Sequence, residues 1–445
     1  MKILLVGDNR TSPNWGGRAV SIALHRLLSK RHTISGVVTG LRALELGYVN
    51  TTAPTRVCRF FEGRRHRTRL AEWYLGVERL LGASDAIDPD PKRTVDHIVR
   101  YRGRYSELAD LYDKVGAADA VVINAEGDLV FTTPPRRIAL FLLAMAELGL
   151  QMGKIVYVVN SLVADCPITG RNEQTVAAAR DIFSRCQIVL TRDPESLSYV
   201  RDEMPSVASE YVPDAAFLWS KMGSCRGSNL PSDGDFLIPF PEKDHYLGRL
   251  DFSQPYVLLG GSAGVGRERE RAVQSYRTLL RRLQELGPPV YLIEADGPDS
   301  FLEQIAIEEG VGIVPVYTPI VASASILANA RLLISGRYHP SILASLGGTP
   351  CVFLGATSHK TQSLQRVLGY DEQTEFGIFP SDEEIERIVR LGRRYLLDGA
   401  ELREAIRNVA ERRSQEAGQL LHWIGDQSSE ASRHTTAPFE MGTAT

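Results

Sequence analysis

One stretch of this sequence, residues 331–360, constrains the fold more than any other. It begins with a compact apolar run at 331–335 that predicts a buried parallel strand. Pro340 then suits the first turn of a helix, where a missing N–H group costs nothing, and the Gly-Gly pair at 347–348 ends that helix. A second apolar strand follows at 351–354. A strand–loop–helix–strand unit of this kind predicts a parallel sheet in an α/β fold.

Charged side chains occupy the loops that follow these two strands. Arg337 and His339 lie between the first strand and the helix, and His359 and Lys360 follow the second strand. In open α/β sheets, ligands bind at the carboxyl ends of the strands, and a helix N-terminus attracts anions. A guanidinium can bind carboxylate or phosphate with two hydrogen bonds, and histidine exchanges protons near neutral pH. The pattern predicts a site for a small, highly charged anion; the alternative is a surface arginine beside a helix-capping histidine.

Bulk composition narrows the class of protein. The 445 residues suffice for two or three domains, and a formal net charge of −3 argues against general nucleic-acid binding. Five scattered cysteines without a CxxC pair indicate neither a disulfide framework nor a zinc site, and we expect no metal. No secretory signal and no membrane-spanning run is evident. We expect a cytoplasmic protein, and contact with the inner face of the membrane is left open.

Two regions of the chain each contain several apolar strands that alternate with amphipathic helices. We expect a first domain over residues 1–225 and a second over 255–425, joined by a connection at 226–254 that lacks clear periodicity. The polar residues 426–445 are expected to be disordered. Two α/β domains with ligand loops at their strand ends predict a binding cleft between them.

An insertion at about 40–115 interrupts the first domain. Residues 56–69 contain six arginines and one glutamate, and an amphipathic aromatic stretch follows at 70–81. A charged helix is expected at about 94–115. A solvated helical insertion is the simpler interpretation. The alternative is a basic and aromatic surface that faces a phosphorylated or lipid-linked acceptor.

The first domain offers three further candidate groups, each at the end of a predicted strand. They are the segment Asn14, Trp15, Gly16 and Gly17, the set Asn124, Glu126 and Asp128, and the single residue Arg192. Glycines let a ligand approach the backbone, carboxylates orient hydroxyls or act as a base, and arginine neutralises anions. Each group also has a structural alternative: a tight turn, helix capping or a surface ion pair.

A glycine-rich loop at 260–266 follows the first strand of the second domain. Its spacing is not GxGxxG, and the acidic residues Glu294 and Asp296 lie farther on than the ribose-binding partner of a dinucleotide site. A dinucleotide site is therefore weakly supported. The loop could instead wrap a phosphate, with Ser262 assisting.

Taken in order along the chain, these motifs resemble the polysaccharide pyruvyl transferase family. The matching pieces are NWGG at 14–17, DAVVINAEGDLVF at 119–131, IVLTRDPES at 188–196, VPDAAF at 212–217, LISGRYHPSILASLGGTP at 333–350 and HK at 359–360. The most specific is the Ser-Gly-Arg-x-His element that begins at Ser335. Two positions depart from the family pattern. Gly17 stands where many members have an acidic residue, and AEGD at 125–128 stands where many have glycines.

The resemblance implies two Rossmann-like domains that face each other across a cleft, similar to GT-B glycosyltransferases. It implies phosphoenolpyruvate as the donor, a free, nucleotide-linked or lipid-linked saccharide as the acceptor, and no cofactor. The product would be a pyruvate ketal on two sugar hydroxyls. The implied donor-binding residues are Arg192, Ser262, Ser335, Arg337, His339, His359 and Lys360. The implied acceptor-binding residues are Asn14, Trp15, Gly16, Gly17, Asn124 and Glu126.

The resemblance also implies roles in catalysis. Arg337, Lys360 and Arg192 would neutralise the donor, and His339 would protonate its methylene carbon. Glu126 or Asp128 would deprotonate the acceptor. Two other functions stay open: a GT-B glycosyltransferase whose nucleotide sugar is held by the 260–266 loop, and a carbohydrate- or anion-binding relative without catalysis. The sequence predicts neither the acceptor sugar nor the oligomeric state.

Overall fold

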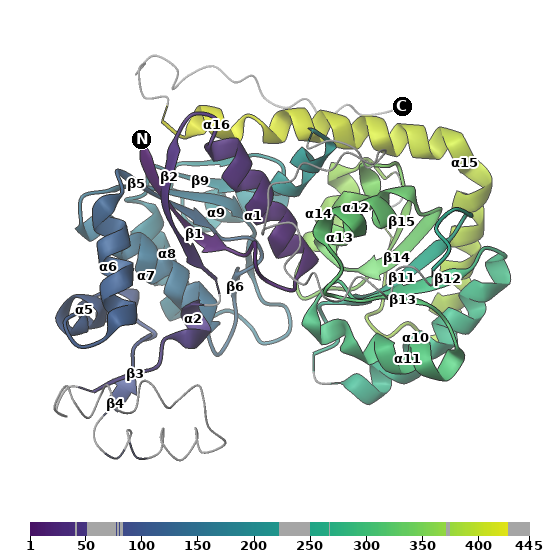
Figure 1. Ribbon diagram of the computed structural model, residues 1–445, viewed down its shortest axis with the longest axis horizontal. Helices are drawn as coiled ribbons and strands as arrows, with labels where there is room; N and C mark the ends of the chain where they lie inside the picture. Colours follow the sequence, from purple (N-terminus) through teal and green to yellow (C-terminus); the bar gives the residue numbers. More distant parts are fainter. Residues whose placement is uncertain are drawn as a thin grey trace.

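The computed structural model describes residues 1–40, 42–50, 77, 80, 83–221, 250–266, 268–370 and 374–425. These residues form two α/β domains that lie side by side, the first in purple to teal and the second mainly in green (Figure 1). The segments at 56–69, 226–249 and 426–445 lie outside the described residues. The interpretations offered for the basic segment, most of the interdomain connection and the tail therefore stay predictions.

The first domain is built on a six-stranded parallel sheet of order β10-β9-β7-β5-β1-β2. Every residue of the central strand β5 and of β9 is buried, as expected for parallel strands covered on both faces. The strands are β1 (Lys2–Asp8), β2 (Thr33–Thr39), β5 (Ala120–Asn124), β7 (Ile155–Ser161), β9 (Ile188–Thr191) and β10 (Ser209–Tyr211). Two small sheets pair β3 (Tyr48–Asn50) with β4 (Ala83–Asp85) and β6 (Leu129–Phe131) with β8 (Val163–Asp165).

Helices pack around this sheet. They are α1 (Trp15–Leu28), α2 (Arg42–Glu45), α5 (Pro91–Tyr101), α6 (Ser106–Ala117), α7 (Arg137–Gln151), α8 (Glu173–Phe183), α9 (Pro194–Glu203) and the 3-10 helix η1 (Ala215–Lys221). The charged helix expected at 94–115 is wrong as one element, because the chain turns between α5 and α6. Val95 and Leu111 are fully buried within the core cluster of the first domain. This half of the expected insertion is therefore part of the domain core and not a solvated addition.

The second domain repeats the architecture with a parallel sheet of order β13-β12-β11-β14-β15-β16. Its strands are β11 (Val257–Ser262), β12 (Val290–Ile293), β13 (Ile313–Val314), β14 (Leu332–Gly336), β15 (Cys351–Leu354) and β16 (Glu375–Phe376). Its helices are α10 (Arg269–Leu283), η4 (Gln284–Leu286), η5 (Gly297–Ser300), α11 (Phe301–Glu309), α12 (Ile320–Asn329), α13 (Tyr338–Ser345) and α14 (Lys360–Val367). The unit predicted at 331–360 is present as β14, α13 and β15, with α13 beginning two residues before Pro340.

The chain ends by crossing back from the second domain to the first. Helix α15 (Asp382–Ala417) bends at Gly399, whose φ of 52° interrupts the helical backbone, and α16 (Leu420–Trp423) follows. The yellow helix in Figure 1 runs above both domains. Ser220 of η1 donates to Ser414 of α15 at 2.6 Å, and the His32 ring lies 3.1 Å from the carbonyl oxygen of Ile424. The closing helices, expected in the second domain, thus also hold the first.

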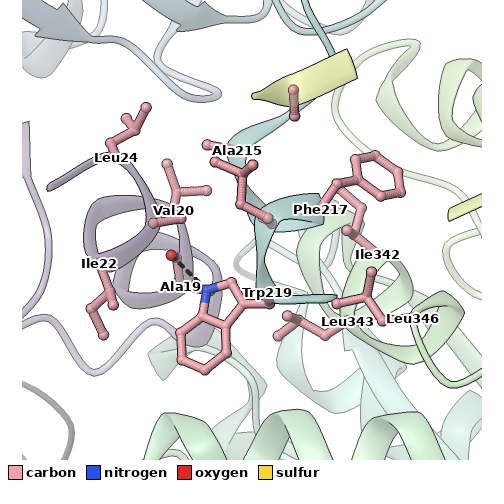
Figure 2. Close-up of a cluster of buried hydrophobic side chains, with 14 of the residues drawn as sticks. Ala19, Val20, Ile22, Leu24, Ala215, Phe217, Trp219, Ile342, Leu343 and Leu346 are labelled. Carbon is pink, nitrogen blue, oxygen red and sulfur yellow. Dashed lines mark hydrogen bonds between the residues drawn. The ribbon is translucent and has the colours of Figure 1, made fainter. Parts of the chain in front are cut away.

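Apolar side chains from both domains form one continuous core between them. Figure 2 shows Trp219 of η1 between Ala19 of α1 and Leu343 of α13. The indole N–H of Trp219 donates to the carbonyl oxygen of Ala19 at 2.8 Å. This packing fixes how the strand ends of the two sheets face each other, and therefore the shape of any site between them. Within the described ranges, no helix has the length and hydropathy needed to cross a bilayer.

Candidate functional site

A cavity of about 430 Å³ lies between the two domains at the carboxyl ends of their strands. Its volume suits a small-molecule ligand. The first domain contributes the loops after β1 and β5 and the start of α7, and the second contributes the loops after β12, β14 and β15. The acidic and basic side chains in its wall are Glu126, Asp128, Arg136, Arg192, Asp296, Arg337, His339 and Lys360.

His339 is held in this wall by a buried carboxylate from the first domain. Its Nε2 lies 3.4 Å from Oδ2 of Asp214 and 3.2 Å from Nη1 of Arg192. Arg192 in turn donates to Asp214 at 3.3 Å, and its guanidinium lies over the ring of Tyr338. Burial lowers the pKa of His339, while Asp214 works in the opposite direction. His339 and Arg192, predicted as parts of one site, therefore meet through a residue to which the sequence analysis gave no role.

The predicted ligand loop at 14–17 is the beginning of a helix. Asn14 caps α1 by accepting a hydrogen bond from the Gly17 amide at 2.8 Å. Gly16 packs against the imidazole of His339, because a Cβ on Gly16 would lie 2.1 Å from Nδ1 of that ring. Asn14, Gly16 and Gly17 line the cavity. The glycines were expected to let a ligand approach the backbone. At Gly16, the missing Cβ instead leaves space for the His339 ring of the second domain.

Trp15 does not face the cavity, contrary to the acceptor-binding role implied for it. Its side chain is fully buried, and its indole N–H donates to the carbonyl oxygen of Val316 at 2.8 Å. Arg18, one turn later, donates to the same oxygen at 3.1 Å and to that of Thr318 at 3.0 Å. The start of α1 therefore anchors the first domain to the second.

Arg337 is already neutralised by two carboxylates of its own domain. Its Nε and Nη2 donate to Asp299 at 3.1 and 2.7 Å, and its Nη1 donates to Asp296 at 2.9 Å. Burial works to lower the pKa of Arg337, but Asp299 and Asp296 outweigh it and raise the pKa. Arg337 lines the cavity. The pair of hydrogen bonds that its guanidinium was expected to donate to an anionic ligand is already donated to Asp299. The network fixes the β14–α13 loop.

Ser335 and Ser262 support this loop from behind and do not line the cavity. Ser335 accepts from the Arg337 amide at 3.0 Å and donates to the carbonyl oxygen of Gly261 at 3.1 Å. Ser262 donates to the carbonyl oxygen of Gly355. Both serines, expected to bind the donor, are engaged in backbone hydrogen bonds within the second domain.

The glycine loop at 260–266 owes its glycines to packing. A Cβ on Gly261 would lie 2.0 Å from Oδ1 of Asp299, and one on Gly264 would lie 2.3 Å from the side chain of Ile378. Within this loop only Ala263 reaches the cavity. Residues 260–264 also match the GxSxG pattern of hydrolase nucleophile elbows, but Ser262 is buried and hydrogen-bonded to backbone.

His359 does not line the cavity, but it makes a contact between the two domains. Its Nε2 lies 2.9 Å from Oδ1 of Asp193, and Asp193 caps α9 by accepting from the amide of Ser196 at 2.8 Å. His359 was expected from the family resemblance to bind the donor. The structure gives it a structural contact with the capping residue of a first-domain helix.

Glu126 combines strain with burial. Its φ of +44° lies in the left-handed region that favours glycine, which strains a side-chain-bearing residue. Its Oε1 accepts from the side-chain amides of Asn9 at 3.0 Å and Asn124 at 3.1 Å. Burial raises the pKa of Glu126 to about 7. Asn124 itself lies behind the wall and also donates to the carbonyl oxygen of Gly7, so it orients Glu126 instead of lining the cavity.

Asp128 and Lys360 have pKa values shifted toward neutrality by burial. Burial raises the pKa of Asp128 to about 6, against the influence of Arg136, Arg192 and Lys360. Burial lowers the pKa of Lys360 to about 7, assisted by the nearby positive charge of Arg337. Perturbed groups in one cavity are a mark of functional sites.

Sequence reasoning missed Arg136, which lines the cavity and donates to the carbonyl oxygen of Gly127 at 3.2 Å. The available signal was an arginine directly before an apolar helical stretch, since Arg136 is the N-cap residue of α7. Asp214 was missed although it stands in the VPDAAF segment directly after a strand. In the described part of the chain, no group of three His, Cys, Asp or Glu side chains could hold a metal ion.

A model of the family described as polysaccharide pyruvyl transferase matches residues 58–358. The chain belongs to the polysaccharide pyruvyl transferase family. Among curated protein sequences, none matches the chain.

Solved structures show that this pyruvyl transferase family member has a GT-B fold. A UDP-N-acetylglucosamine 2-epimerase from Listeria monocytogenes is similar, with a TM-score of 0.51, 11% identity, and 98% of this chain and 99% of that chain covered. Os79 from O. sativa in complex with UDP has a TM-score of 0.50, 12% identity, and 93% and 95% covered. At these identities the likeness concerns the fold alone, and it confirms the two Rossmann-like domains expected from the sequence.

The residues matched by the family model supply part of the cavity lining. The matched residues include Glu126, Arg192, Arg337 and His339, all of which line the cavity. The cavity also uses the start of α1 and Lys360, which lie outside the matched range. The site of this pyruvyl transferase family member is therefore assembled from the family region and from segments on either side of it.

Proposed function

We propose that this protein transfers the pyruvyl group of phosphoenolpyruvate onto two hydroxyls of a saccharide to form a pyruvate ketal. One observation carries the proposal beyond family membership. His339, whose Nε2 lies 3.4 Å from the buried carboxylate of Asp214, lines an interdomain cavity that also contains Glu126 and several cations. An acid, a base and positive charge in one small cavity suit the addition of an alcohol to an anionic enol ester.

The first step is proton transfer from His339 to the methylene carbon of the donor. Burial lowers the pKa of His339, so the free site favours the neutral ring. A bound donor, which carries a carboxylate and a phosphate, favours the protonated ring through its negative charge. Asp214, whose Oδ2 lies 3.4 Å from Nε2, stabilises the same state. Protonation leaves an oxocarbenium-like centre at the carbon that bears the phosphate.

A sugar hydroxyl then attacks this carbon, and Glu126 accepts the hydroxyl proton. Its pKa of about 7 suits a base that works near neutral pH. The carbon–oxygen bond to phosphate breaks, and phosphate leaves with the bonding electrons. A second hydroxyl attacks the same carbon and closes the ketal. One of the two hydroxyl protons restores His339, and the other leaves on the phosphate.

Phosphate release from phosphoenolpyruvate tests the proposal directly. We expect release that depends on an acceptor in a panel of free, nucleotide-linked and lipid-linked saccharides, with a ketal in the product. His339→Gln should lower turnover by roughly 10²–10⁴-fold, the usual contribution of a general acid. Arg201→Ala is the control, because the Arg201 side chain is 56% exposed and pairs with Glu210 at the surface. Wild-type turnover in His339→Gln would remove His339 from the mechanism.

A nucleotide-sugar transferase is the second candidate, because Os79 of similar fold was solved in complex with UDP. Against it, the 260–266 loop that was expected to hold a nucleotide packs on Asp299 and Ile378. Thermal-shift titration separates the two functions. Stabilisation by phosphoenolpyruvate without stabilisation by UDP supports pyruvyl transfer, and the opposite result favours the nucleotide sugar.

A further inference from the structure

Four arginine and lysine side chains line the cavity, and two of them have a carboxylate partner among the described residues. Arg337 is paired with Asp296 and Asp299, and Arg192 with Asp214. Across the described ranges, Arg136 and Lys360 have no carboxylate within ion-pair distance. Arg136 makes one hydrogen bond, to the backbone of Gly127, and keeps its other N–H groups for further partners.

Three helices begin at this cavity without a side-chain cap. The N-cap positions of α7, α13 and α14 are Arg136, Arg337 and His359, and none of the three makes a capping hydrogen bond through its side chain. None of the three helices has an acidic residue in its first turn. Their first backbone N–H groups and the positive ends of their dipoles thus lie at the cavity without a built-in negative charge.

Ser358 and Lys360 provide further unsatisfied groups at the start of α14. Ser358 lines the cavity, is only 9% exposed, and its buried Oγ has no hydrogen-bond partner. Lys360 is the first residue of α14 and follows the loop after β15. A lysine at the start of a helix that follows a strand is also how P-loops present a lysine to phosphate, although this loop lacks the P-loop glycine directly before the lysine.

We propose that Arg136, Ser358 and Lys360 form a phosphate subsite that receives the phosphoryl group of the donor. The inference rests on the proposed function. The resemblance gave neutralisation of the donor to Arg337, Lys360 and Arg192; the subsite keeps Lys360 and adds Arg136 and Ser358. Arg136 and the protonated form of Lys360, which the negative charge of a bound phosphate favours, match the charge of a phosphate monoester near neutral pH. Arg136 belongs to the first domain and Lys360 to the second, so a phosphate bound here contacts both domains.

Asp128 lies near Arg136 and Lys360 and would contact a phosphate bound between them. Burial already raises the pKa of its carboxyl to about 6. The negative charge of the phosphate raises it further, so Asp128 carries a proton in the complex and donates a hydrogen bond to a phosphate oxygen. Asp128→Asn keeps a donor at this position and is expected to keep phosphate binding.

Calorimetric titration with inorganic phosphate, phosphoenolpyruvate and pyruvate tests the subsite without any need for turnover. Arg136→Ala and Lys360→Gln should each weaken the binding of phosphate and phosphoenolpyruvate by roughly 10–100-fold, the loss expected for a hydrogen bond to a charged group. Ser358→Ala should weaken it by roughly 3–10-fold. Pyruvate, which lacks the phosphoryl group, should bind these variants as it binds the wild type. Arg201→Ala serves as the matched surface control.

The melting temperature without ligand shows whether each variant is folded, and Ser358→Ala tests the site if either cation variant is not. The subsite is overturned if the wild type binds no phosphate, or if the folded variants bind phosphate as the wild type does. Phosphate binding that needs Arg136 and Lys360, without phosphate release toward any saccharide, would support the subsite and reject pyruvyl transfer. Pyruvyl transfer with unchanged phosphate affinity in the variants would keep the function and reject the subsite.

Discussion

Glu126 on the first-domain wall and Arg337 on the second-domain wall use charge in opposite ways. Each wall also has a cation of the other kind: Arg192 of the first is paired with Asp214, and Lys360 of the second has no carboxylate partner among the described residues. On the second-domain wall, Arg337 is locked between Asp296 and Asp299. On the first-domain wall, Glu126 and Arg136 take part in no ion pair within the described part of the chain, and burial holds the pKa of Glu126 at about 7. Paired charges fix the shape of a wall, whereas unpaired charges with shifted pKa values are available for binding and proton transfer. The comparison predicts that changes at Glu126 on the first wall lower activity, whereas changes to the carboxylates that hold Arg337 on the second wall lower stability.

The largest expected effect is on catalysis at the first wall. Glu126→Gln keeps the shape of the side chain and an oxygen that can accept from Asn9 and Asn124, but it cannot take a proton from the acceptor. Turnover should fall by roughly 10²–10⁴-fold. Phosphate release with a saccharide acceptor measures this, and thermal unfolding at pH 8 should show no loss of stability. Unchanged turnover would mean that the base lies elsewhere.

The second wall should respond to Asp299→Asn with a loss of stability. Asp299 is fully buried, and its replacement leaves Arg337 without its main counter-charge. The free energy of unfolding should fall by about 3–5 kcal/mol, the cost of breaking a buried ion pair. Denaturant unfolding measures this loss. The control Glu210→Gln removes an exposed pair with Arg201 and should cost about 1 kcal/mol or less. Equal effects of the two changes would contradict the contrast between the walls.

A smaller effect is expected in how stability depends on pH. Burial raises the pKa of Glu126 from 4.5 to about 7, so the folded protein holds a proton that the unfolded chain releases. The stabilisation from this proton is complete below pH 4.5 and is lost as the pH rises through about 7. Between pH 5 and 8, Glu126→Gln should therefore gain about 3 kcal/mol of stability relative to the wild type.

Unfolding of the wild type and Glu126→Gln across this pH range measures the gain. The comparison between the two proteins cancels the titration of all other groups that the change leaves undisturbed. A difference that stays constant with pH would show that Glu126 is ionised throughout, and it would remove the contrast with the second wall.

The second wall was also the more predictable from sequence. The segment that carries Arg337 and His339 is local, and its strand–loop–helix geometry follows from one apolar run, one proline and one pair of glycines. The partners of Arg337 are not local, because Asp299 and Asp296 lie 38 and 41 residues away along the chain. The same pattern of side chains predicts an anion-binding arginine when these partners are unknown and a structural arginine when they are known.

For the first wall, the positions of three cavity-lining residues could be predicted from the sequence, but their burial could not. Glu126, Asp128 and Arg192 were recognised from their positions after strands, and all three line the cavity. The pKa shifts of the carboxylates depend on desolvation, which follows from how the loops pack and not from residue type. Arg136 was missed because the N-cap of a helix gives no indication of what its side chain faces. Trp15 was misplaced because an aromatic residue beside glycines suits a ligand loop and a buried helix start equally well.

The contact between Gly16 and His339 has a consequence for engineering. The proposed proton donor belongs to one domain, and the space for its ring depends on a missing Cβ in the other. A chimera that combines the first domain of one family member with the second domain of another would therefore need a glycine at this position, whatever acceptor its first domain recognises. Compatibility between exchanged halves would thus depend on this backbone position before any substrate is considered.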